Sequence, residues 1–160
     1  MNLSRDEAGL YLGHNGGETH NVHDQLHQIW RGMADEGLIS DEQYRNGTVL
    51  NFYKSPQEFM APLNDSSSAP YRNGLRLVDE RTVYVKCPYR RRWNENGDTA
   101  TFAAGLMATI RSWSRHSFIG AAGEAAADTL FERLQQRIAD APSDWSLDYV
   151  EHHQMMEKVA

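Results

Sequence analysis

Apolar residues recur at helical spacing early in the chain. The spacing predicts an amphipathic helix over residues 21–36, with Asn21 as its N-cap and Gly37 as its stop. The residues of its apolar face are Val22, Leu26, Ile29, Trp30 and Met33. The segment before this helix, residues 1–20, carries several glycines without periodicity and is predicted to be a loop.

Two shorter helices are predicted from their start signals. Ser40 and Gln43 form a capping-box pattern, which indicates a helix ending near Gly47. Ser55 followed by Pro56 predicts a helix over residues 55–63, because proline is favoured at the first helical position.

The second half of the chain alternates between strand and helix patterns. A polar loop is predicted over residues 64–74, and a strand over residues 75–87 with a turn at residues 79–81. Two helices are predicted next, over residues 98–115 and 123–139, followed by a last strand over residues 145–155.

The order helices, strand, two helices, strand is typical of a layered α/β fold, or of an α+β fold when the chain is taken alone. At 160 residues the chain has the length of a single domain. We expect a helical segment over residues 1–63 and a strand–helix–helix–strand segment over residues 75–160.

Composition and charge narrow the class of protein. The net charge of −6 disfavours nucleic-acid binding, since phosphate contacts need clustered Lys and Arg. The basic run Tyr89–Trp93 is flanked by aromatic residues and is interpreted as solvated surface. No apolar run is long enough to cross a membrane, and the first residues do not resemble a signal peptide. Cys87 is the only cysteine, so no disulfide framework is possible within the chain. We expect a soluble cytoplasmic protein.

Histidines on the first helix offer one candidate chemistry. His20, His23 and His27 follow the spacing i, i+3, i+7, which places them on one face of a continuous helix. Three imidazoles are able to hold a transition metal, but polar residues bordering the apolar stripe explain the spacing better. We therefore expect no metal site. The glycines between Gly13 and Gly17 lack a phosphate-binding motif and are interpreted as a turn.

Three segments together resemble one enzyme family. Met33–Ile39 resembles a Met-x-x-Glu-Gly-Leu-Ile segment, and Val49–Glu58 resembles an Asn-x-Pro-x-Tyr-x-x-Ser-x-x-Glu stretch. Residues 110–131 resemble the paired helices Met-Arg-Ala-Val and Phe-Gly-Glu. The family is the plant-type S-adenosylmethionine-dependent (SAM-dependent) carboxyl methyltransferases, called SABATH, and the similarity covers their C-terminal half.

The resemblance implies a helical cap plus the last strands and helices of a SAM-methyltransferase-like fold. It implies that a small organic acid binds at the positions that line the family's substrate pocket. In this chain these positions are Val22, His23, Tyr53, Ile110, Trp113 and Trp145. His23 replaces a bulky aromatic residue of the family and Trp113 replaces a small aliphatic one, so the shape and polarity of the pocket should differ.

The family's cofactor-binding half has no counterpart in this sequence. We therefore expect a methyltransferase-like, substrate-binding part that binds no cofactor by itself and is inactive alone, whereas an intact homologue would use SAM. The alternative is a non-enzymatic protein that binds a small ligand or associates with itself. Strands that normally join a larger sheet would expose unpaired edges, and a homodimer would cover them.

Overall fold

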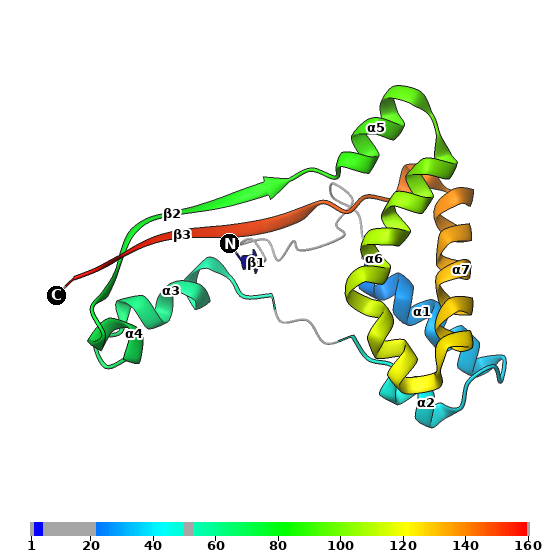
Figure 1. Cartoon of the computed structure of the whole chain (residues 1–160), viewed down its shortest axis with the longest axis horizontal. Coiled ribbons are helices and arrows are strands. Elements are labelled where there is room, and N and C mark those ends of the chain that lie inside the picture. The colour runs from blue at the N-terminus through cyan, green and yellow to red at the C-terminus, as the bar shows by residue number, and fades with distance from the viewer. Residues whose placement is uncertain (1, 5–21, 50–52, 160) are drawn as a thin grey trace. The chain divides into compact units, whose positions relative to one another are not determined.

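The computed structural model describes residues 2–4, 22–49 and 53–159. The elements along the chain are β1 (Asn2–Ser4), α1 (Val22–Asp35), α2 (Asp41–Asn46), α3 (Pro56–Asn64), α4 (Ala69–Arg72), β2 (Leu75–Val85), α5 (Pro88–Asn96), α6 (Thr99–Ala122), α7 (Glu124–Asp140), the short 3₁₀ helix η1 (Pro142–Asp144) and β3 (Tyr149–Lys158) (Figure 1). Helices and an antiparallel sheet are both present, which confirms a mixed α+β protein.

The chain divides into two compact units. The sheet unit comprises Met1–Leu12, Phe52–Lys86 and Asp148–Ala160, and the helical unit comprises Gly13–Asn51 and Cys87–Leu147. Each unit takes residues from both halves of the sequence, so the units do not coincide with the expected segments 1–63 and 75–160.

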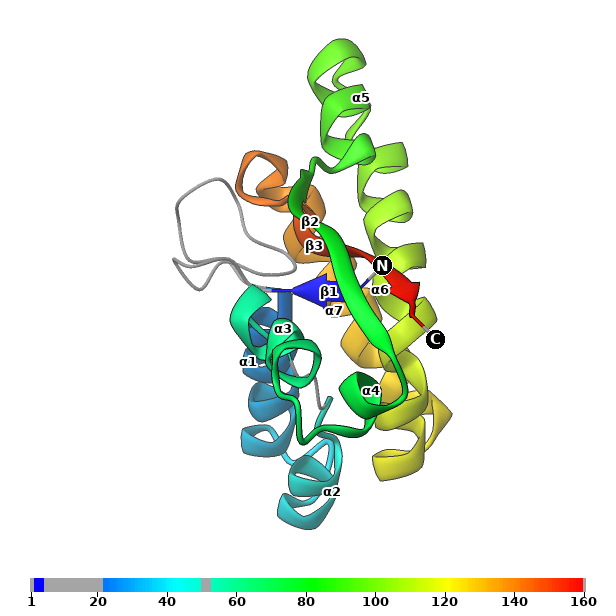
Figure 2. The ribbon, with the colours of Figure 1, turned by 90° about the vertical axis from the view of Figure 1, so that its left-hand side faces the viewer.

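In the sheet unit, β3 lies between β1 and β2 and is antiparallel to both (Figure 2). The two outer strands are therefore parallel to each other. β1 pairs only with residues 150–152 of β3, whereas β2 follows β3 over its whole length. The ladder is regular from Asp79 to Val85, and a shift between Leu77 and Asp79 leaves Val78 as a bulge.

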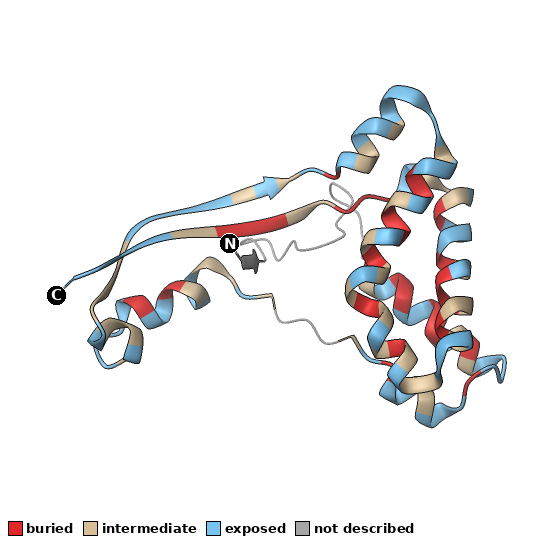
Figure 3. Ribbon diagram, viewed as in Figure 1, coloured by how far each residue is buried: buried red, intermediate tan, exposed pale blue. Residues whose placement is uncertain are grey.

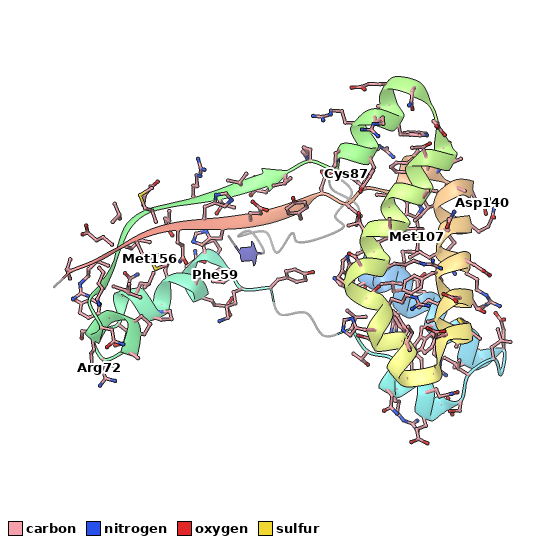
Figure 4. The ribbon with its side chains drawn as sticks, viewed as in Figure 1. Phe59, Arg72, Cys87, Met107, Asp140 and Met156 are labelled. Atoms are coloured by element: carbon pink, nitrogen blue, oxygen red, sulfur yellow. The ribbon has the colours of Figure 1, made fainter. Side chains whose placement is uncertain are left out.

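Helix α3 packs against this sheet through a small apolar and aromatic cluster. The Phe59 ring, which is labelled in Figure 4, stacks on the ring of His152, with centroids 5.7 Å apart. Met60 is buried beside them, and the Gln154 side-chain amide lies 3.2 Å from its sulfur. His152 is itself buried, and its Nε2 lies 3.3 Å from a Glu80 carboxylate oxygen, although without the angle of a hydrogen bond.

The helical unit is built on α6 and α7, which lie side by side, with α1 packed against α7. The turn between α6 and α7 is made at Gly123, whose φ of 85° suits glycine. Buried residues line the facing sides of these helices (Figure 3). The most deeply buried large side chains of this core are Trp30, Phe102, Phe118, Phe131, Leu26, Met33, Leu106, Ile110, Leu130, Leu134 and Ile138.

A polar clamp fixes α5 to the segment after α7. The Arg90 guanidinium donates hydrogen bonds to the carbonyl oxygens of Pro142 (2.5 Å), Ser143 (2.6 Å) and Trp145 (3.1 Å). These carbonyls lie within η1 and directly after it, and a guanidinium with five donors can satisfy several of them at once.

Several sequence expectations need correction. Residues 69–72 form helix α4 inside the expected loop over residues 64–74, and residues 88–96, for which the sequence pattern predicted no element, form helix α5. The expected turn at residues 79–81 is wrong, since β2 is continuous there. β3 begins at Tyr149 rather than at Trp145. The predicted loop over residues 1–20 is wrong at Asn2–Ser4, which form β1. The rest of this segment lies outside the described residues.

Helix α6 is longer than expected because its apolar stripe continues past Arg115 to the buried Phe118. Ser114 stays within the helix by donating its hydroxyl to the Ile110 carbonyl at 2.7 Å. No described helix is both long and apolar enough to cross a membrane.

Candidate functional site

One face of α1 carries three side chains of the candidate site. His23, His27 and Trp30 lie four and three residues apart, so they follow one another along the same side of the helix. Trp30 points into the core, whereas His23 is half-buried and His27 is exposed. The helix therefore presents an apolar base flanked by two imidazoles.

The short helix α2 supplies the opposite wall. It starts with the predicted capping box, in which Ser40 and Gln43 exchange hydrogen bonds with each other's backbone. The helix carries Tyr44 and Arg45 at its end and is followed by the buried Gly47. A fixed start thus determines where these two side chains stand.

Gly47 permits a close approach between this wall and α1. An added Cβ at Gly47 would lie 2.2 Å from Nε1 of Trp30, a distance that no side chain tolerates. The indole N–H donates to the Tyr44 carbonyl at 3.2 Å. Because Gly47 has no side chain, the Trp30 ring can pack directly against the backbone at the end of α2.

Phe118 from α6 completes the aromatic floor. Its ring lies 5.0 Å from the Trp30 ring at an interplanar angle of 60°, and its other side meets Phe131 edge-on at 5.9 Å. Such tilted contacts are favourable for aromatic rings. Trp30 and Phe118 therefore form one packed aromatic surface, called the aromatic floor.

These elements line a cavity of about 410 Å³ that opens to solvent within the helical unit. This volume is typical of small-molecule sites. Its apolar lining consists of Leu26, Trp30, Val49 and Phe118, its polar lining consists of His23, Asp24, His27, Tyr44, Arg45 and Thr48, and Gly47 completes it. An apolar base with polar groups around the mouth suits a small planar organic molecule that carries a polar or charged end.

The two histidines differ in their surroundings. Burial lowers the pKa of His23, against the raising effect of the neighbouring Asp24 carboxylate. Its ring also contacts Trp113, with centroids 5.2 Å apart. His27 instead lies 3.2 Å from the Tyr44 hydroxyl through its Nε2. His23 is therefore predominantly neutral at pH 7.

Arg45 supplies positive charge at the cavity. Its guanidinium is exposed and makes no hydrogen bond or ion pair with the described residues. Arg31, the neighbouring cation, is engaged instead with Asp35 at 3.1 Å and lies over the Tyr44 ring. Arg45 is thus the guanidinium at this cavity that is available to an anionic ligand.

The residues implied by the family resemblance are distributed unequally. His23 lines the cavity and Trp113 contacts His23. Val22, Ile110 and Trp145 are at most 4% exposed and belong to the core of the helical unit rather than to the cavity lining. Tyr53 belongs to the sheet unit. Their common role in binding an acid stays a prediction.

Of the three histidines weighed as metal ligands, His20 lies outside the described residues. Among residues that the structure does describe, no group of three or more His, Cys, Asp or Glu side chains is arranged to hold a metal ion.

Sequence reasoning missed Tyr44, Arg45 and Gly47 as site residues. The helix that carries them was predicted, but a six-residue helix shows no periodicity that would assign its faces. The only available signal was Gly47 after a short capped helix, which we interpreted as a helix stop alone.

No family model matches the chain, and no curated protein matches it either. The resemblance to the carboxyl methyltransferases therefore rests on the quoted motifs.

Proposed function

We propose that the helical unit binds a small planar organic acid in the cavity between α1, α2 and α6. The observation that carries this proposal is an aromatic floor, Trp30 and Phe118, combined with the exposed Arg45 guanidinium at the same cavity. Guanidinium groups bind carboxylates through paired, charge-assisted hydrogen bonds.

The electrostatics of the lining favour one orientation of such an acid. Asp24 also lines the cavity and would repel a carboxylate, so the acidic group should lie toward Arg45. Neutral His23 and the Tyr44 hydroxyl then offer hydrogen bonds without a net charge. The flat body of the ligand would rest on the aromatic floor.

We further propose that the chain is the substrate-binding part of a SAM-dependent carboxyl or O-methyltransferase-like protein. The support for this is the resemblance of Met33–Ile39, Val49–Glu58 and residues 110–131 to the C-terminal half of that family. The described residues do not fit the cofactor itself, since they form no glycine-rich turn between a strand and a helix for a nucleotide. The proposed role of this chain is therefore to hold the acceptor acid.

The acid proposal is tested by titrating the full chain with benzoate and indole-3-acetate, following tryptophan fluorescence and heat. We expect saturable binding and a loss of roughly tenfold in affinity for Arg45→Gln, as for an exposed charge-assisted hydrogen bond. The matched control is Arg91→Gln, an exposed arginine on α5 that does not line the cavity. Equal affinity of Arg45→Gln and the wild type would contradict the orientation, and no binding of either acid would contradict the proposal.

The methyltransferase proposal is tested separately by calorimetry with SAM and its demethylated product. We expect neither to bind the chain alone. Tight binding of either would contradict the proposed division of roles. The alternative, a non-enzymatic ligand-binding protein, predicts acid binding without any dependence on a cofactor-binding partner.

We also keep a cytoplasmic location as a proposal, in line with the buried thiol of Cys87.

A further inference from the structure

Strand β2 forms one edge of the sheet in the sheet unit. It is eleven residues long, and its side away from β3 pairs with no described strand (Figure 1). The large side chains of Val78 and Tyr84 on this strand are each more than half exposed to solvent. A long edge strand presents a row of unpaired backbone groups, which is a template for a further strand.

Proteins commonly protect such edges with charge, and the charges on β2 have an unusual pattern. Asp79 and Arg81 are two residues apart, so they lie on the same face of the sheet. Both are exposed, and neither makes an ion pair or hydrogen bond with any residue that the structure describes. Charges of one sign would repel a second copy of the strand, whereas this pair is self-complementary.

We propose that β2 pairs antiparallel with β2 of a second copy of this chain, about a two-fold axis at Glu80. In an antiparallel pair of identical strands, the residue numbers of opposite residues have a constant sum. This sum must be even, because the two-fold axis makes the pairs i–j and j–i the same type, whereas hydrogen-bonded and non-hydrogen-bonded pairs alternate along the ladder. With the axis at Glu80, Asp79 of each copy lies opposite Arg81 of the other. The pairing thus forms two symmetric cross-strand ion pairs and is isologous, as in most homodimers.

Glu80 meets its own copy on the axis, and this is the cost of the register. Its carboxylate lies on the opposite face from Asp79 and Arg81, 3.3 Å from Nε2 of His152 in the same chain. Facing like charges destabilise a strand pair. Replacing Glu80 with Gln should therefore tighten the dimer, which is the reverse of the effect of removing a favourable charge.

The bulge at Val78 limits the length of the regular pairing. Beyond the two ion pairs, Val78 would lie opposite Thr82 of the second copy. A short ladder with few apolar side chains buries little surface, so the dimer should be weak and in exchange with the monomer.

The test is sedimentation velocity on the full chain across the micromolar range. We expect a reversible monomer–dimer equilibrium for the wild type. Asp79→Arg and Arg81→Asp should each weaken the homodimer by roughly tenfold or more, because each turns both ion pairs into like-charge pairs. An equimolar mixture of the two variants should form a heterodimer, since all facing charges are again opposite. The double variant D79R/R81D should dimerise like the wild type.

Arg91→Asp on α5 is the matched control, since it makes the same charge change away from β2 and should leave the equilibrium unchanged. Circular dichroism shows whether each variant is folded. A monomeric wild type, single variants that dimerise normally, or a mixture that stays monomeric would each overturn the proposal. Because the cavity lies in the helical unit, acid binding can fail or succeed independently of this result.

Discussion

At the residue scale, the site depends on a glycine, Gly47, because any side chain at this position would collide with Trp30. Gly47 has an ordinary φ of −83°, so glycine is required there for space and not for backbone conformation. An alanine Cβ would meet three atoms of the Trp30 indole within 3 Å. Because that ring is also fixed by Phe118 and by its hydrogen bond to Tyr44, it has little freedom to move.

We therefore expect Gly47→Ala to lower the free energy of unfolding by about 1–3 kcal/mol, as for overpacking of a close-packed core. The measurement is urea denaturation followed by tryptophan fluorescence. Gly32→Ala in α1 is the control, because nothing lies within 4 Å of an added Cβ there, and helix propensity predicts a gain of about 0.5–1 kcal/mol. Equal free energies of unfolding for the two variants would contradict the close approach of Gly47 to the Trp30 indole.

His23 gives the protein a predictable response to acid. Its pKa in the folded protein is lowered from 6.5 by burial, so the unfolded chain takes up the proton first as the pH falls. Protonation of His23 therefore does not lower the free energy of unfolding well above pH 6.5. The free energy of unfolding falls progressively as the pH drops from 6.5 toward the pKa of the folded state.

Between pH 7 and pH 5, we expect the wild type to lose more stability than His23→Gln, which has no titrating group at this position. Urea denaturation at both pH values measures the difference. NMR titration of the His23 ring gives an independent reading, and a midpoint at or above that of an unfolded histidine would contradict the burial argument.

At the scale of elements, α5 and η1 show how a charged side chain organises backbone. The sequence Tyr89–Trp93 was interpreted as a solvated basic run, and Arg91 and Arg92 are indeed exposed. Arg90 differs because it is bound to three carbonyl oxygens more than fifty residues away. Nothing in the local pattern distinguishes it from its neighbours.

Arg90→Gln should destabilise the helical unit by roughly 2 kcal/mol, because hydrogen bonds from a charged group are lost and carbonyls are left unsatisfied. The matched variant Arg91→Gln, with its exposed side chain, should change stability by less than about 0.5 kcal/mol. Chemical denaturation of both variants, monitored by tryptophan fluorescence, tests the difference. Similar losses would mean that the clamp contributes nothing specific.

At the scale of the whole molecule, the two units carry different probes. All four tryptophans, Trp30, Trp93, Trp113 and Trp145, belong to the helical unit, so tryptophan fluorescence reports on that unit alone. The cavity is also lined only by residues of this unit. Binding and stability of the helical unit can thus be followed without interference from the sheet unit.

Tyr53 tests whether the proposed acid site is confined to the helical unit. The family resemblance assigns Tyr53 to the substrate pocket, but it belongs to the sheet unit. We expect Tyr53→Phe to leave the affinity for the acid within about twofold, in line with a surface change that touches no ligand. A loss of tenfold or more, measured by the same titration, would show that both units contribute to one site.

The sequence by itself determined the local elements, because their causes act within a few residues. The caps at Ser40 and Ser55 and the apolar stripes of α1, α6 and α7 place the starts of these helices within a few residues of the observed ones, although α6 ends later than predicted. Capping hydrogen bonds and helical periodicity need no distant partner.

Only the tertiary structure decided the sheet order and the cavity. Trp30 and Phe118 are far apart in sequence, and nothing local marks them as the two sides of one floor. Likewise, β1 and β2 bind opposite edges of β3, the last strand of the chain. Contacts of this kind depend on which apolar faces and strand edges meet after the chain collapses, and a pattern confined to neighbouring residues does not contain that choice.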